Sequence, residues 1–157
     1  MESKRICLLD LNYTLVSNQM QTRFLRPFSK RMDAELYRLD LIEAVKNDYV
    51  IIVTARPKYQ QEMTMENIFK KTGWKPNEAY FNDFDAEPPV FKRSALNRFI
   101  FPKYGEEGSL YYAVESNPKT REMYAEYGIV AEPYDRFIKK KNIEIEEQKG
   151  KQMTMFG

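Results

Sequence analysis

Histidine is absent from the 157-residue sequence, and cysteine occurs only once. Without histidine there is no histidine-dependent catalytic triad, no histidine metal ligand and no imidazole general base. The lone Cys7 cannot form a disulfide within the chain, which favours a reducing compartment, and we expect the cytoplasm. No stretch approaches the ~20 consecutive apolar residues of a membrane span, and the first apolar run is too short for a secretory signal. We therefore expect no membrane partner.

A large net charge is also absent. The 25 Lys and Arg residues nearly balance the 23 Asp and Glu residues, which leaves a formal net charge of +2. This balance provides no general electrostatic attraction to nucleic acid. The length is that of one ordinary domain, large enough to bury ~70% of the surface of the unfolded chain.

Short apolar runs alternate with longer amphipathic stretches along the chain. The runs predict buried strands at residues 6–9, 49–53, 79–81, 109–114 and 129–130. Strands that alternate with helices of about 10–15 residues are typical of βαβ units. We therefore predict an α/β fold with an open parallel sheet, helices on both faces, and no inserted segment long enough for a cap domain.

Apolar residues at helical spacing predict the positions of the helices. One helix is expected to follow an N-cap at Asp33, with a core-facing stripe formed by Leu36, Leu39, Ile42 and Val45. A second is expected at residues 58–71, ending at Gly73, with the inward-facing residues Met63, Ile68 and Phe69. A third is expected to start at Lys92.

The first predicted strand ends in a carboxylate, Asp10. A buried parallel strand delivers the residue that follows it to the carboxyl edge of the sheet, where sites form in open α/β folds. An aspartate in this position is also a common way to cap a turn. The residues that accompany Asp10 further along the chain favour a site.

Four segments, in this order, resemble the four motifs of the haloacid-dehalogenase-like phosphotransferases. They are Asp10-Leu11-Asn12-Tyr13-Thr14, the apolar run 50–57 that contains Thr54, the isolated Lys92, and residues 112–118 with Glu115-Ser116. The resemblance covers roughly residues 5–135, and its second half is most similar to the 3′-phosphatase domain of phage polynucleotide kinase-phosphatases. It implies a Rossmann-like fold without a cap domain.

This resemblance also implies a chemistry. Asp10 would be a nucleophile that forms an aspartyl phosphate, Thr54 would hold a phosphate oxygen, and Lys92 would be a cationic clamp. A Mg²⁺ ion would be held by Asp10, by the backbone carbonyl of Asn12 and by Glu115. The implied enzyme is a phosphoric monoester hydrolase acting on phosphates of nucleotides or of nucleic-acid ends.

Two positions depart from the pattern of the family. Asn12 stands where most of the phosphatases have a second aspartate, the general acid/base, and an amide cannot exchange a proton near neutral pH. Ser116 stands where an acidic residue is the usual metal ligand. Two hypotheses therefore remain open: a phosphatase, or a catalytically weakened relative that serves as a binding module on a replication sliding clamp.

Several arginines are candidates for binding substrate. Arg23 and Arg26 lie in residues 17–33, which correspond to the flap region of the family, and Arg56 lies near the end of the second motif. A guanidinium group binds phosphate through two parallel hydrogen bonds, so we expect these three residues to contact the substrate. The alternative for each of them is a solvated basic surface.

The sequence predicts two parts, a domain at residues 1–135 and a polar tail at residues 136–157. The charge-rich stretch from Arg136 to Lys151 is expected to be mobile or loosely helical. After it, residues 152–156 resemble a sliding-clamp-binding peptide, in which Gln152, Met153, Met155 and Phe156 would contact the partner. The alternative is a chance similarity in an unstructured segment.

Overall fold

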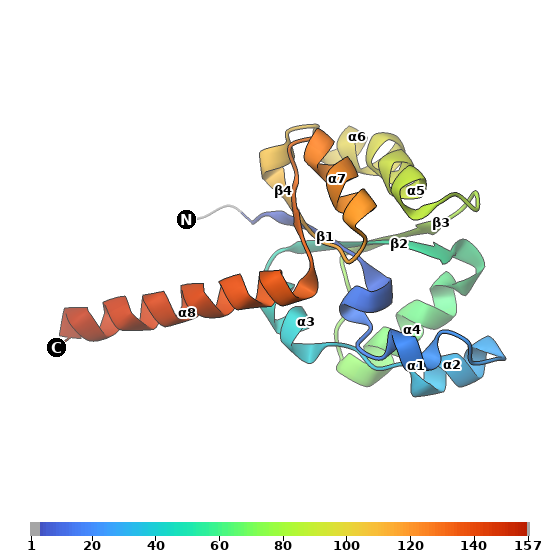
Figure 1. Ribbon diagram of the computed structural model, residues 1–157, viewed down its shortest axis with the longest axis horizontal. Coiled ribbons are helices and arrows are strands. Elements are labelled where there is room, and N and C mark those ends of the chain that lie inside the picture. The colour runs from blue at the N-terminus through green and yellow to red at the C-terminus, as the bar shows by residue number, and fades with distance from the viewer. Residues whose placement is uncertain (1–3, 157) are drawn as a thin grey trace.

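A computed structural model describes residues 4–156, with backbone only for residues 153–156. Its centre is a sheet of five parallel strands in the order β3-β2-β1-β4-β5 (Figure 1). The strands are β1 (Ile6–Leu9), β2 (Tyr49–Pro57), β3 (Glu78–Asn82), β4 (Tyr111–Val114) and β5 (Val130–Glu132). The predicted open parallel sheet is confirmed.

Helices cover both faces of the sheet. The helices are α1 (Gln19–Thr22), α2 (Phe28–Ala34), α3 (Leu39–Val45), α4 (Gln61–Thr72), α5 (Pro88–Ala95), α6 (Phe101–Tyr104), α7 (Pro118–Glu126) and α8 (Tyr134–Phe156). Figure 1 shows α5, α6 and α7 on one face of the sheet and α1 to α4 on the other. Among the described residues, no helix is both long enough and apolar enough to cross a membrane.

The two faces of the central strands build two separate cores. In β1, Cys7 and Leu9 pack on the α3 and α4 side, whereas Leu8 packs on the side of α5 and α7. Successive side chains of a strand point to opposite faces, so an uninterrupted apolar run is needed where both faces are covered. Burial raises the pKa of the Cys7 thiol to about 12, which keeps it protonated and unreactive.

The prediction of a helix that starts after Asp33 is wrong about where the helix begins and about two of its four core-facing residues. The chain leaves α2 at Ala34 and is non-helical until α3 begins at Leu39, and Leu36 and Leu39 are 55% and 64% exposed. The side chain of Asn18 holds this turn, because it donates to the Ala34 carbonyl at 2.8 Å and accepts from the Leu36 amide at 2.9 Å. A polar residue distant in the sequence therefore satisfies the backbone groups that a helix would have used.

The inward face of α4 also differs from the prediction. Ile68 is buried as expected, but Met63 and Phe69 are 44% and 54% exposed. The buried face of α4 consists of Thr64, Asn67 and Ile68. Its polar members are accommodated because they hydrogen-bond to groups from other elements. The predicted end of this helix is confirmed by Gly73, which has a left-handed φ of 72°.

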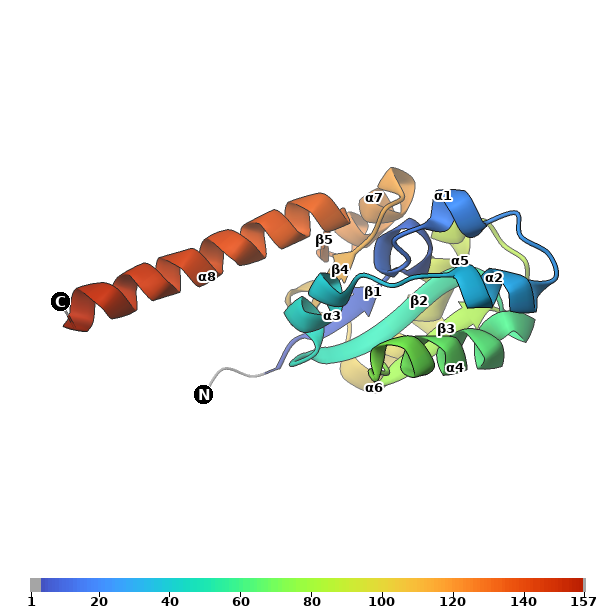
Figure 2. The ribbon, with the colours of Figure 1, turned by 90° about the horizontal axis from the view of Figure 1, so that it is seen from below.

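Residues 134–156 form one helix, α8, which extends away from the sheet in both views (Figures 1 and 2). Its first turns are attached to the domain, because the ring of Phe137 stacks on that of Tyr112 with centroids 5.7 Å apart. The helix thus crosses the division expected at residue 135, and that division stays a prediction. Most of α8 beyond Lys141 is exposed.

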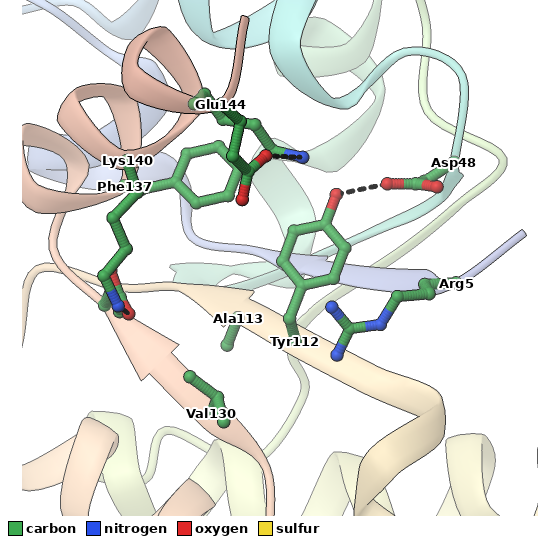
Figure 3. A pocket seen from close by; sticks show the side chains of 10 residues that line it. Arg5, Asp48, Tyr112, Ala113, Val130, Phe137, Lys140 and Glu144 are labelled. Carbon is green, nitrogen blue, oxygen red and sulfur yellow. Dashed lines mark hydrogen bonds and ion pairs between the residues drawn. The ribbon is translucent and has the colours of Figure 1, made fainter. Parts of the chain in front are cut away.

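A cavity of about 320 Å³ lies between α8 and the sheet (Figure 3). Its lining includes Arg5, whose guanidinium lies 5.0 Å from the ring centroid of Tyr112, and Asp48, which accepts a hydrogen bond from the Tyr112 hydroxyl. Arg5 precedes β1 and Asp48 precedes β2, so part of the lining comes from the amino edge of the sheet, and Glu132 contributes from the other end of β5.

The carboxylate of Glu78 provides a test of the fold by pH. Burial alone would raise its pKa, but hydrogen bonds from Tyr104, Tyr80 and Tyr49 lower the pKa of Glu78 to about 2. A depressed pKa stabilises the fold above the unfolded value of ~4.3, and this contribution is lost as the pH falls toward 2. Glu78→Gln should therefore lower the free energy of unfolding by ~1–3 kcal/mol at pH 7 and by about half as much at pH 3.

Urea titrations of the wild-type protein and Glu78→Gln at several pH values measure this difference. A difference that stays constant from pH 7 to pH 3 would show that the carboxylate of Glu78 is not held ionised by the three tyrosines.

Candidate active site

The strand register brings two carboxylates to the carboxyl edge of the sheet. In β1, Leu9 pairs with Val114 of β4, and the amide of Asp10 continues this ladder by donating to the Val114 carbonyl at 3.0 Å. On the other side of β4, the Glu115 amide donates to the Glu132 carbonyl at 2.9 Å. Asp10 and Glu115 are therefore held by their backbones at the ends of adjacent strands.

Lys92 of α5 joins these two carboxylates. Its ammonium Nζ lies 2.8 Å from Asp10 Oδ1 and 2.5 Å from Glu115 Oε1, and the residue is only 2% exposed. The helix that carries it begins with Pro88 and Pro89, which suit a first turn because proline lacks an N–H that would be unpaired there. The structure thus brings together Asp10, Lys92 and Glu115.

The second oxygen of Asp10 is fixed as well. Asp10 Oδ2 accepts hydrogen bonds from Thr14 Oγ1 at 2.7 Å, from Ser116 Oγ at 2.9 Å and from the Ser116 amide at 3.4 Å. Ser116, which the sequence marks only as a lost acidic residue, is therefore a positioning group for Asp10. Both oxygens of the carboxylate have defined orientations before any ligand binds.

These contacts set the protonation of the cluster. Burial alone would raise the pKa of Asp10, but the Lys92 ammonium and the hydrogen bonds lower it below the ordinary value. Burial and the neighbouring Asp10 carboxylate raise the pKa of Glu115 to about 8. Burial opposes the charge of Lys92, yet the two carboxylates raise its pKa. These shifts favour an ionised Asp10 beside a charged Lys92, with Glu115 as the carboxylate that takes up a proton more readily.

The turn after Asp10 folds back over the site. Tyr13 has a left-handed φ of 63°, which is uncommon for a residue with a side chain and is typical of strained functional loops. This turn brings the carbonyl oxygen of Asn12 to 3.4 Å from Ser116 Oγ. Ser116 Oγ therefore lies close to both Asp10 Oδ2 and the Asn12 carbonyl, so three oxygen atoms gather at this position.

The oxygen atoms at this position suit Mg²⁺, which prefers oxygen ligands and retains several waters. Asp10 supplies the one charged oxygen, and the Asn12 carbonyl and the Ser116 hydroxyl supply neutral oxygens. Glu115 is less directly available, because its Oε1 contacts Lys92 and its Oε2 accepts from the Asn117 amide at 3.1 Å. Within residues 4–156 no cluster of three or more acidic, cysteine or histidine side chains is poised to hold a metal ion.

Thr54 and Arg56 lie at the end of β2, the other neighbour of β1. Thr54 is fully buried, and its Oγ1 accepts a hydrogen bond from the Arg56 amide at 3.1 Å, so the hydroxyl proton is left to donate. Arg56 is 2% exposed and its guanidinium is paired with Glu35 and with Asn12 Oδ1. Arg56 is thus not an open cation on the surface.

The other two predicted arginines lie on the α1 and α2 side of the molecule. Arg23 Nη1 donates to the Tyr13 hydroxyl at 3.0 Å, which places this cation beside the turn that follows Asp10. Arg26 is exposed, and its side chain donates to the neighbouring Leu25 carbonyl. Arg23 is therefore associated with the site, whereas no hydrogen bond described for Arg26 reaches it.

The predicted partner-binding residues lie at the far end of α8. Gln152 is exposed. The side chains of Met153, Met155 and Phe156 lie outside the described residues, so the clamp-binding peptide stays a prediction.

Comparison of the sequence with protein-family models and with curated proteins gives no match. Solved structures do match. A chain from the structure of the Pnkp1/Rnl/Hen1 RNA repair complex aligns with a TM-score of 0.63 and 17% identity, over 86% of this chain and 45% of that chain. A phospho-aspartyl intermediate analogue of phosphoserine phosphatase aligns with a TM-score of 0.57 and 13% identity, over 89% of this chain and 91% of that chain.

These likenesses confirm the predicted α/β fold with an open parallel sheet. The protein spans less than half the length of the chain that it matches in the RNA repair complex. At such low identities the likeness defines the fold alone, and the activity rests on the residues described above.

The buried ion pair gives a prediction for stability. Lys92→Met removes the ammonium and leaves the Asp10 carboxylate buried beside Glu115 without a counter-charge. Removing one partner of a buried pair is strongly destabilising, so we expect the free energy of unfolding to fall by ~3–5 kcal/mol. Arg98→Met is the matched control, because Arg98 pairs with Asp83 at the surface and such pairs contribute ~0–1 kcal/mol.

Chemical denaturation of both variants at pH 7 measures the two effects. Equal losses in Lys92→Met and Arg98→Met would contradict a special role for the ammonium in holding the site together.

Proposed function

We propose that the protein is a Mg²⁺-dependent phosphatase that acts through an aspartyl phosphate at Asp10. The observation that carries this proposal is the ionised Asp10 carboxylate, aimed at the carboxyl edge of the sheet and held by Lys92, Thr14 and Ser116. An oriented carboxylate with a low pKa is a suitable nucleophile toward phosphorus. The haloacid-dehalogenase-like fold supports the same reaction class by analogy.

In the first step an oxygen of Asp10 attacks phosphorus and forms an O–P bond, while the bond from phosphorus to the leaving oxygen breaks. The leaving oxygen then takes a proton from solvent. In the second step water attacks phosphorus and loses a proton to solvent, the bond between phosphorus and the Asp10 oxygen breaks, and inorganic phosphate leaves the restored carboxylate. Lys92 keeps Asp10 ionised and oriented. The Thr54 hydroxyl, whose oxygen already accepts from Arg56, donates its proton toward a phosphoryl oxygen.

Mg²⁺, when bound, supplies positive charge that offsets the negative charge of the phosphoryl group. We propose that Asp10 and the carbonyl of Asn12 hold it, that Ser116 contributes its hydroxyl, and that Glu115 supports it from a greater distance. A serine in place of a carboxylate makes this a weaker metal site. Ser116→Asp should consequently bind Mg²⁺ more tightly than the wild-type protein, measured by calorimetry, and unchanged affinity would argue against Ser116 as a neighbour of the metal.

We propose phosphorylated nucleotides or nucleic-acid ends, with the phosphate at the 3′ position, as the substrate class. Two features support this choice: the likeness to a chain of an RNA repair complex, and the surroundings of the site. Beside the turn that follows Asp10, the cation of Arg23 contacts two exposed aromatic residues, Tyr13 and Phe24. The Cζ atom of Arg23 lies 4.6 Å from the centroid of the Phe24 ring. Aromatic rings and arginines together are typical of surfaces that bind bases and phosphates.

A panel of phosphate esters that includes 3′-phosphorylated oligonucleotides, assayed with and without Mg²⁺, tests the proposal. We expect release of inorganic phosphate that depends on Mg²⁺ and is abolished in Asp10→Asn, because an amide is not a nucleophile for phosphorus. Asp83→Asn is the control, since Asp83 is a surface carboxylate paired with Arg98. Wild-type turnover in Asp10→Asn would exclude the aspartyl phosphate.

The second candidate function is that of a binding module on a replication sliding clamp. Two observations favour it: the likeness of residues 152–156 to a clamp-binding peptide, and the projection of α8 away from the domain (Figure 2). The replacement of acidic residues by Asn12 and Ser116 is compatible with such a role, because binding to a partner does not require catalysis. In this role the peptide would occupy an apolar groove with Met153, Met155 and Phe156.

Titration of the protein, with and without residues 150–157, against the sliding clamp of its own replication system tests this candidate. We expect a dissociation constant on the order of micromolar for the longer form, because a short peptide loses entropy when it binds. Equal binding by the two forms, or binding by neither, would exclude the peptide as a clamp ligand.

A further inference from the structure

A buried ion pair lies directly behind Asn12. The Arg56 guanidinium donates to both oxygens of Glu35, at 3.1 Å to Oε1 and 2.9 Å to Oε2. The side chains of Arg56 and Glu35 are 1% and 0% exposed. This two-bond geometry fixes the plane of the guanidinium, and the Thr64 hydroxyl accepts a further bond from it at 3.1 Å. Arg56 therefore has little freedom to rotate.

The remaining bond of this guanidinium determines how Asn12 is oriented. Arg56 Nη2 lies 2.7 Å from the side-chain oxygen of Asn12. A guanidinium group only donates hydrogen bonds, so the atom that faces it must be the amide oxygen of Asn12 and not the amide nitrogen. The NH₂ group of Asn12 must then point away from Arg56.

That NH₂ group is not used elsewhere in the described structure. None of the hydrogen bonds found among residues 4–156 involves Asn12 Nδ2, and Asn12 is partly exposed whereas Arg56 and Glu35 are buried. The same residue presents its backbone carbonyl to Ser116, which contacts the Asp10 nucleophile. The free donor thus lies on the residue that borders the reacting position.

We infer that Arg56, anchored by Glu35, is a positioning residue that presents the Asn12 NH₂ group to the leaving oxygen of the substrate as a neutral hydrogen-bond donor. This inference rests on the proposed phosphatase function. It replaces the expectation that Arg56 contacts substrate phosphate. It also gives Asn12 a catalytic role for which an amide is suited, namely stabilisation of developing charge without transfer of a proton.

A neutral donor has a recognisable effect on rates. The leaving oxygen carries more negative charge in the transition state when its conjugate acid is weak, and it then gains more from a hydrogen bond. Loss of the Asn12 donor should therefore slow an ester with a poor leaving group much more than one with a good leaving group. A residue needed only for folding would slow both by the same factor.

Phenyl phosphate, which has a poor leaving group, and 2,4-dinitrophenyl phosphate, which has a good one, serve as the pair of probes. Removal of one preorganised donor lowers kcat by ~10²–10³-fold in a well-studied case. We expect Asn12→Ala to lower kcat for phenyl phosphate by at least ~10-fold, with a much smaller effect on the dinitrophenyl ester. Equal losses on both esters would overturn the inference.

Arg56→Lys tests the positioning step, because a lysine cannot form the planar two-bond pair with Glu35. It should show the same selective loss as Asn12→Ala, and the double variant should be no worse than Asn12→Ala alone. Arg98→Lys is the matched control, since Arg98 makes a comparable two-bond pair with Asp83 at the surface and should leave both rates unchanged. Independent, multiplicative losses for positions 12 and 56 would contradict the inference.

A readout that does not require turnover separates this inference from the proposed function. The side-chain ¹⁵N–¹H signals of Asn12, assigned by their absence in Asn12→Ala, are followed while inorganic phosphate and Mg²⁺ are added. We expect them to shift in the wild-type protein and to shift less in Arg56→Lys. If the Ser116 amide signal shifts on addition of phosphate and Mg²⁺ but the side-chain signals of Asn12 do not, the inference is wrong, even if the protein has phosphatase activity.

If the wild-type protein shows no turnover but the Asn12 signals respond to phosphate, the proposed function fails and the orientation of Asn12 stands. If there is neither turnover nor any response of these signals to phosphate, the inference falls together with the proposed function.

Discussion

The ammonium group of Lys92, buried between Asp10 and Glu115, is the contact on which the site depends. It joins a helix on one face of the sheet to the ends of two adjacent strands. Two carboxylates so close together and shielded from water would repel each other, and one must bind a proton or a cation. Lys92 supplies that positive charge, and burial beside Asp10 raises the pKa of Glu115. The cluster is therefore stable while Asp10 stays ionised.

The fold accounts for the positions of these three groups. Strands β1 and β4 are apolar because both of their faces are covered, and Asp10 and Glu115 follow directly after them. Both residues therefore lie at the carboxyl edge of the sheet, where ligands bind in open α/β folds. On the opposite face, a second buried cation, Arg56, is balanced by Glu35. The two ion pairs thus lie on either side of the Asp10 turn. One orients the carboxylate of Asp10, which we propose as the nucleophile, and the other orients the side chain of Asn12.

The sequence predicts the parts of this arrangement that depend on short-range patterns. The strand at residues 6–9 and the end of α4 at Gly73 follow from local chemistry, and the resemblance to the family marked Asp10, Lys92 and Glu115 as candidate site residues. Contacts between distant residues were not predictable. Leu36 and Leu39 match a helical stripe, yet both are exposed, and Asn18 holds the backbone of Leu36 in a turn.

Arg56 shows the same limit within the site. From the sequence we expected Arg56 to contact substrate, because it lies in a motif that resembles a phosphate-binding one. Nothing in the sequence indicates that Glu35 is its partner. Glu35 follows a stretch without periodicity, so its burial could not be anticipated. Ser116 was likewise read only as a missing ligand, since its hydrogen bond to Asp10 depends on the turn at Tyr13 and on the register of β1 with β4.

Whether Asp10 becomes covalently phosphorylated is the central question, and it has a direct test. Borohydride reduces an aspartyl phosphate to homoserine, which peptide mass spectrometry detects. The wild-type protein, quenched during turnover of a 3′-phosphorylated oligonucleotide with Mg²⁺ and then reduced, should contain homoserine at position 10 and at no other aspartate. Release of inorganic phosphate with Asp10 unmodified, or modification of a different residue, would contradict this account.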